Sequence, residues 1–419
     1  MPDRNHDQPV PRSVYGFGLT SFLNDTASEM AYWVLPAFIA SLGAGPAQLG
    51  IIEGIAESIA SFAKLFSGYL ADRLPRRRPI VVAGYTVANA VKPLLSIVSS
   101  WWQILGIRFT DRLAKGIRGT ARDVMVAESV DSSKIGSAYG LIQAMDSAGA
   151  IVGPLAALAL IGHFGMRGVF KATAIPGVLC ILVAWLGIRE TRRGLSRRAA
   201  DVSSTAPDEH ADAPVLARET LNARARELAA WHPRLPRAFY YVLAVVTLFS
   251  LGNSSDMFLV LRAESAGIHA SYAPLLGLVF NITFTLFSWP AGKFSDRFSR
   301  SAIVAAGYFV FAVVYFVFAA APSPLAVWLI MAFYGLFYAL TNPVLKALVV
   351  EAVGIEVRGR ALGIYFFVTG VTTLLASVIT GALWKMYGAP VPFYLSAAIA
   401  AVSALALLAH GTRRKPRQA

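Results

Sequence analysis

Long apolar stretches separated by short polar ones run along nearly the whole chain. Clear examples cover residues 14–42, 80–98, 178–188, 239–260 and 302–320. A helix needs about 20 predominantly apolar residues to cross the hydrocarbon core of a bilayer, and these stretches are near that length. Hydropathy counts about twelve such segments. The pattern therefore predicts an all-α membrane protein with twelve transmembrane helices.

One polar region interrupts this pattern near the middle of the chain. Residues 189–237 are rich in charge, alanine, serine and proline, a composition typical of a linker. This region divides the spans six and six. We therefore expect an N-terminal six-helix bundle at residues 1–188, a cytoplasmic linker at 189–237 and a C-terminal six-helix bundle at 238–419.

The fourth predicted span carries a stripe of charges. At helical spacing its seven ionisable residues fall within an arc of about 140°; they are Arg108, Asp111, Arg112, Lys115, Arg118, Arg122 and Asp123. Ionisable groups in a membrane are costly and usually face a water-filled cavity or a partner. The stripe predicts a polar pathway, with its last three residues at the cytoplasmic surface.

Composition supports membrane insertion and gives the basic charge an ordinary cause. The chain has 419 residues, of which 56% are hydrophobic, and its mean hydropathy is +0.56. The net charge of +14 comes largely from arginine clusters in the loop at 73–78, in the linker and at the C-terminus. Cytoplasmic loops collect Lys and Arg, so we expect a multi-pass inner (plasma) membrane protein with both termini cytoplasmic, and no nucleic-acid partner.

Motifs for a resident cofactor, a metal site or an enzyme are not apparent. Cys180 is the only cysteine, and the six histidines show no paired metal-ligand spacing, which excludes cysteine-based sites and argues against a soft-metal site. No His-Glu-x-x-His, Gly-x-Ser-x-Gly or phosphate-loop pattern occurs. We expect no cofactor and no enzymatic activity.

The two halves of the chain repeat each other. The segment from Gly68 to Asp72 and Arg73 recurs at Gly292, Asp296 and Arg297, 224 positions later, whereas Glu128/Glu351 and Gly140/Gly363 are 223 apart. An internal repeat of six spans predicts two pseudo-symmetric bundles with a substrate site between them near the membrane midplane.

The repeated segment carries a family resemblance. Gly68, Asp72 and Arg73, followed by Arg76 and Arg77, resemble the loop 2–3 signature of the major facilitator superfamily, and Gly292, Asp296 and Arg297, followed by Arg300, resemble its second copy. The resemblance implies the major facilitator fold and secondary transport by alternating access. It also implies that these Gly, Asp and Arg residues form a conformational gate that stabilises the outward-facing state.

Two further resemblances point to bacterial drug/proton antiporters. Gly149, Gly153 and Pro154 are similar to the antiporter motif of the superfamily, although Ala157 and Leu158 stand where that motif has two glycines. The segment Arg112-Leu113-Ala114-Lys115-Gly116 resembles their helix-four motif, with lysine in place of glutamine. They imply proton-coupled export of a small molecule and a part for the arginine in the coupling.

The N-terminal half concentrates the charges that this coupling needs. The predicted proton-coupling network comprises Asp25, Glu29, Glu53, Glu57, Arg108, Asp111, Arg112, Lys115 and Asp146. Glu53 and Glu57 share a helix face with Lys64 and are the foremost candidates, with Arg108 or Arg112 as the moving counter-charge.

The C-terminal half supplies the predicted substrate-binding residues Asn253, Asp256 and Tyr338. The expected partners are a small-molecule substrate, protons and the lipid bilayer, and the expected state is a monomer. The alternatives are proton-coupled uptake of an organic anion, export of a divalent metal ion through carboxylate ligands, and a non-transporting membrane receptor.

Overall fold

The computed structural model describes residues 11–32, 34–43, 46–191, 235–254, 256–268, 273–320 and 323–411, and within these ranges all regular structure is helical. The helices are α1 (Arg12–Tyr32), α2 (Leu35–Ser41), α3 (Pro46–Arg73), α4 (Arg78–Val91), η1 (Lys92–Ser96), α5 (Trp101–Glu128), η2 (Ser132–Lys134), α6 (Ile135–Ala172), α7 (Ala174–Gly187), α10 (Arg237–Gly252), α11 (Met257–Ser265), α12 (Ala273–Arg297), α13 (Arg300–Ala319), α14 (Pro324–Glu351), η4 (Ile355–Val357), α15 (Arg358–Tyr387) and α16 (Pro390–Gly411).

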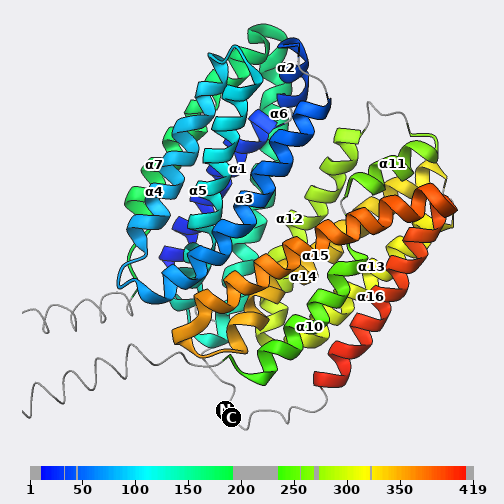
Figure 1. Cartoon of the computed structure of the whole chain (residues 1–419). Coiled ribbons are helices and arrows are strands. Elements are labelled where there is room, and N and C mark those ends of the chain that lie inside the picture. The colour runs from blue at the N-terminus through cyan, green and yellow to red at the C-terminus, as the bar shows by residue number, and fades with distance from the viewer. Residues whose placement is uncertain are drawn as a thin grey trace, which may run out of the picture.

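These helices form two bundles, one from α1–α7 and one from α10–α16 (Figure 1). Gly165 interrupts α6 with φ of +63°, a conformation that glycine adopts without steric cost, so α6 contains one whole span and the start of the next. The pairs α4/η1 and α10/α11 each make one broken span. The described helices thus account for six spans in each bundle, as the sequence predicts.

The two bundles differ in how apolar their spans are. Six described helical stretches are long and apolar enough to cross a membrane, and five of them lie in the second bundle. The sixth covers residues 132–187 and holds two spans. In the first bundle α1, α3 and α5 fall below this threshold because charged and other polar side chains interrupt them, so their polar faces need protein or water as neighbours.

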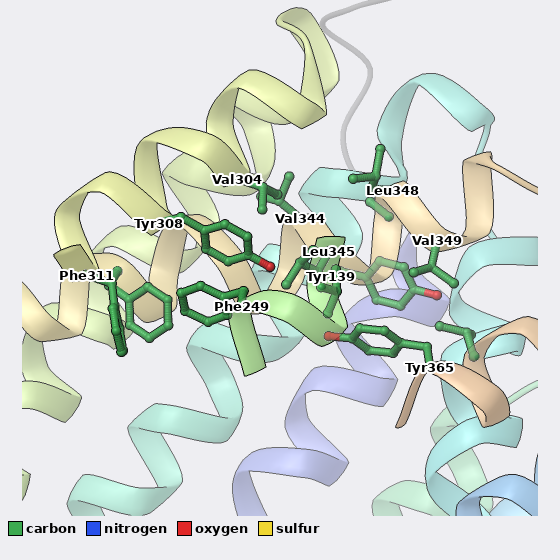
Figure 2. Packing of buried hydrophobic residues seen from close by; sticks show 14 of the residues in the cluster. Tyr139, Phe249, Val304, Tyr308, Phe311, Val344, Leu345, Leu348, Val349 and Tyr365 are labelled. Carbon is green, nitrogen blue, oxygen red and sulfur yellow. The ribbon is translucent and has the colours of Figure 1, made fainter. Parts of the chain in front are cut away.

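The bundles pack against each other through α12 on α6 and α15 on α3. Figure 1 shows the ribbons crossing at the lower end of the view and diverging toward the upper end. The main apolar core continues across this contact: Tyr139 of α6 lies close to Leu345 and Val349 of α14 and Tyr365 of α15 (Figure 2). A second, smaller core belongs to the first bundle alone.

Candidate functional site

The first gate contact joins α3 to α15. The Asp72 carboxylate accepts hydrogen bonds from the backbone N–H groups of Gly359 at 2.8 Å and Arg360 at 2.7 Å. These are the second and third residues of α15, whose N–H groups have no partner within the helix. Asp72 therefore caps a helix of the other bundle, where the helix dipole favours negative charge.

The second gate contact repeats the first with the bundles exchanged. Asp296 of α12 accepts from the backbone N–H groups of Gly136 and Ser137, both at 2.8 Å, and from the Ser137 hydroxyl. Gly136 and Ser137 are the second and third residues of α6. We call these two contacts the latches, and the end of the molecule that holds them the latch end.

Glycines let the bundles come close enough to form the latches. A Cβ atom added at Gly68 would lie 2.3 Å from the Gly359 carbonyl oxygen, and one at Gly292 would lie 2.2 Å from that of Gly136. Such distances fall within atomic contact, so no other residue fits without backbone movement. This explains why the repeated motif begins with glycine.

Ion pairs that the sequence reasoning missed support both latches. Arg77 pairs with Glu128 at 2.7 Å and Arg300 pairs with Glu351 at 3.0 Å. Arg300 also reaches the other bundle, where it donates to the Ser132 carbonyl at 3.0 Å. The 223-residue offset between the two glutamates could have indicated that they hold equivalent places in the two bundles. The predicted gate residues Arg73 and Arg297 are exposed.

A cavity of about 430 Å³ lies between the bundles, above the latches. Seven helices line it: α1, α3, α5 and α6 from one side, and α12, α14 and α15 from the other. Five cationic side chains and three carboxylates take part, namely Lys64, Lys115, Arg118, Arg122 and Lys346 with Asp25, Asp123 and Asp146. Among the described lining residues, positive charges therefore outnumber negative ones.

An ion network crosses the cavity from one bundle to the other. Arg122 contacts Asp123 at 3.0 Å and Asp146 at 3.7 Å, and it donates to the Ser21 hydroxyl at 2.8 Å. Lys346 of α14 then contacts Asp123 at 3.5 Å. The expectation that Arg118, Arg122 and Asp123 lie at the surface is wrong, because Arg118 and Asp123 are buried. Arg118 lies over the ring of Tyr85 in α4, and Asp123 meets Tyr139 of α6 and Lys346 of α14.

The outer part of the charged stripe forms a separate cluster inside the first bundle. Asp111 lies 3.7 Å from Lys92 and 3.9 Å from Arg108, and Lys92 also donates to the side chains of Asn24 and Asn89. The predicted single pathway is therefore two clusters, one within the bundle and one in the cavity. Arg112 is partly buried on the same helix.

The predicted carboxylates are distributed unevenly over these clusters. Asp25 and Asp146 line the cavity, whereas Glu29 is partly buried and its Cβ faces Gly153. Glu53 and Glu57 belong to α3, but their side chains lie outside the described residues. Their pairing with Arg108 or Arg112 stays a prediction.

The antiporter-like motif packs α6 onto α1. A Cβ atom at Gly149 would lie 2.5 Å from the Phe22 carbonyl oxygen, and one at Gly153 would lie 2.7 Å from that of Thr26. Close backbone approach at small residues is a usual way of packing membrane helices. Pro154 follows in the same helix and lines an apolar cleft beside the cavity.

The predicted substrate residues of the second bundle lie together but outside the lining of the cavity. Asp256 accepts hydrogen bonds from the hydroxyls of Tyr334 at 2.6 Å and Tyr338 at 3.2 Å, and Asn253 is the C-cap residue that follows α10. On the cavity side, this bundle instead presents Asn281, Asn342 and Phe366, among others.

Sequence comparison agrees with this architecture. The Major Facilitator Superfamily model matches residues 17–262 and 242–419, so the chain belongs to the Major Facilitator Superfamily of membrane transporters. An uncharacterised MFS-type transporter of Methanocaldococcus jannaschii is 30% identical over 97% of this chain and 96% of its own length. The multidrug resistance protein MdtG of Escherichia fergusonii is 27% identical over 69% of this chain and 67% of its own length.

Solved structures share the fold at low sequence identity. The human organic anion transporter MFSD10 superposes with a TM-score of 0.76 at 15% identity, covering 96% of this chain and all of its own. The Escherichia coli fucose:proton symporter FucP gives a TM-score of 0.69 at 15% identity, covering 95% and 99%. These structural similarities show the shared fold, and the family assignment makes the chain a membrane transporter rather than an enzyme.

Proposed function

We propose that the protein is a secondary active transporter that exports a small molecule in exchange for protons, using the central cavity as its binding site. The observation that carries the proposal is the contact between Asp123 and Lys346, which joins the two bundles inside the cavity at 3.5 Å. A proton on the carboxylate, or a charged solute in the cavity, can break an ion pair at such a position.

The coupling step follows from the charges around Asp123. While ionised, Asp123 attracts Lys346 across the bundle interface and Arg122 within its own bundle. Protonation of Asp123 removes both attractions, so Lys346 loses its hold on the first bundle and the latch end separates more readily. Asp146, which lies against Arg122, offers a second place for the proton in the same network.

Export is the direction that the relatives favour. MdtG relatives are named multidrug resistance proteins, and the glycine motif at residues 149–154 is similar to that of antiporters. Both observations are similarities to members of the family. The direction is tested by measuring flux in proteoliposomes under an imposed pH gradient. The test solutes are those that raise the melting temperature in a screen of anions, cations and neutral compounds.

We also propose that the latch end faces the cytoplasm, together with both termini and the linker at 189–237. The arginine-rich loop at 73–78 follows the latch residue Asp72 directly, and loops of this composition collect on the cytoplasmic side. The latched structure is then outward-facing. Single cysteines at Asp131 and Ser99, in a Cys180→Ala background, should react with an impermeant maleimide from opposite sides of the membrane. Reaction of both from the same side would contradict this topology.

The coupling proposal predicts the effect of Asp123→Asn on conformation. Spin labels at Arg189 and Phe298 report distance at the latch end, and labels at His163 and Tyr387 report distance at the other end; all four side chains are exposed. At alkaline pH the variant should raise the ratio of unlatched to latched molecules at least tenfold, about 1.4 kcal/mol. The wild type should respond in the same direction on acidification.

A matched control separates this effect from a general loss of charge. Lys171→Gln neutralises an exposed residue of the first bundle and should leave both distance distributions unchanged. The melting temperature of each variant checks folding, because leaving a buried charge unpaired costs several kcal/mol. The proposed coupling would be contradicted if the spin-label distances in the folded wild type did not change with pH.

A further inference from the structure

The charge of the cavity limits the substrate that it can hold. Besides the pair formed by Lys346 with Asp123, the cavity presents Lys64 and Lys115, and Lys115 is exposed. The ring centroid of Phe366 is 5.2 Å from the Lys64 ammonium group and 5.9 Å from that of Lys346. The described lining has more cations than carboxylates, and such a surface attracts an anion and disfavours a cation of equal size.

A second hollow opens beside the cavity, between α6 and α12. This lateral cleft has a volume of about 240 Å³ and is lined mainly by apolar side chains, including Pro154, Leu155 and Leu158 of α6 and Leu275 and Leu278 of α12. Asn281 is its one polar side chain within the described lining. Along α12 the cleft extends from residue 275 to residue 281, about 9 Å at the helical rise.

The two hollows adjoin each other. Ala150 and Asn281 line both of them, so the apolar cleft ends where the cationic cavity begins. We propose, on the basis of the function proposed above, that the substrate is an amphiphilic anion. Its acidic head lies in the cavity near Lys115 and Lys346, and its alkyl part lies in the cleft between α6 and α12.

This arrangement satisfies both parts of such a molecule. The acidic head exchanges water for ammonium groups, and charge-assisted contacts of this kind are the stronger hydrogen bonds. The alkyl part leaves water for a lining of leucines, which is worth roughly fourfold in affinity for each fully buried methylene. Leu155 and Leu158 are 49% and 72% exposed in the protein alone, so a chain can reach the cleft from the bilayer.

The test is equilibrium dialysis of radiolabelled decanesulfonate, butanesulfonate and decyltrimethylammonium against the protein in phosphatidylcholine nanodiscs. Sulfonates stay charged at all working pH values, and empty nanodiscs correct for partition into lipid. Decanesulfonate should bind with an affinity at least tenfold higher than either of the other two probes, when affinity is referred to the free aqueous concentration.

Variants assign the two parts separately. Leu155→Trp fills the cleft and should lower the decanesulfonate affinity toward that of butanesulfonate, which itself stays unchanged; Leu179→Trp, at a leucine of α7 with 47% exposure, is the control. Lys115→Gln should weaken both sulfonates by about tenfold, the loss expected for one charged contact. Lys385→Gln, at an exposed lysine of α15, should weaken neither.

Three results would overturn the proposal. Equal affinities for the two sulfonates would mean that the cleft binds no alkyl part of the substrate and is filled by bilayer lipid. Binding of decyltrimethylammonium as tight as that of decanesulfonate would contradict the preference for an anionic head. Absence of binding by any probe would contradict the proposed site. Binding as expected without proton-driven flux would instead contradict the proposed function and leave this inference standing.

Discussion

Gly292→Ala should shift the protein strongly away from the latched state. The added methyl group would lie 2.2 Å from the Gly136 carbonyl oxygen and 3.0 Å from the Gly140 Cα atom, both backbone atoms of α6. Overpacking of this kind costs about 3 kcal/mol, which changes the ratio of latched to unlatched molecules roughly a hundredfold. Spin-label distances between Arg189 and Phe298 measure that ratio directly.

The chain provides a matched control for this substitution. Gly106 of α5 has no atom within 4 Å of its added Cβ, so Gly106→Ala should leave the distance distribution unchanged. Gly68→Ala, at the equivalent place on α3, should reproduce the effect of Gly292→Ala. A latched population that persists in both latch variants would mean that the helices separate there at little cost.

Asp72→Asn and Asp296→Asn should each weaken the latch without affecting solute binding. An amide replaces one acceptor oxygen by an NH₂ group that faces a backbone N–H, and it removes the charge at the helix N-terminus. Losing hydrogen bonds to a charged group costs about 1.5–3 kcal/mol, so the unlatched fraction should rise at least tenfold for each. The same spin-label pair gives the populations.

Three comparisons make the Asp72 and Asp296 experiment decisive. The latches share no residue, so their effects should add in the double variant, whereas Asp131→Asn at an exposed position of the same end should do nothing. Decanesulfonate affinity should equal that of the wild type, because neither carboxylate lines the cavity. A selective loss of binding with unchanged distances would place these residues in the substrate site.

The fold was largely predictable because its signals are repeated. Apolar runs of membrane-spanning length and a motif that recurs after 224 residues predicted two six-helix bundles, and the structure and the family assignment confirm this class. The hydropathy of single spans was a weaker guide: α5 is a full span of 28 residues although its charged stripe lowers its hydropathy. Its charges are tolerated because they lie inside the first bundle or line the cavity between the bundles.

The site was predictable only in part, because helix periodicity shows which residues share a face and not which face they meet. The stripe on α5 was identified, yet its residues divide between a cluster around Asp111 and the cavity network around Asp123. Lys346, from the other bundle, completes that network, and a charge near a helix end gave no indication that it crosses an interface. Likewise, nothing in the sequence marked Gly136 and Gly359 as residues whose backbone N–H groups donate to the latch aspartates.

The two latches have a consequence for the origin of the chain. Each bundle contributes one carboxylate and one helix N-terminus, and each receives the same pair from the other, so the contact surface of a single bundle is complementary to itself. Symmetric homodimers depend on such isologous surfaces. A six-helix ancestor with one copy of this surface would therefore have dimerised through the same two contacts, and gene duplication with fusion would have preserved them within one polypeptide.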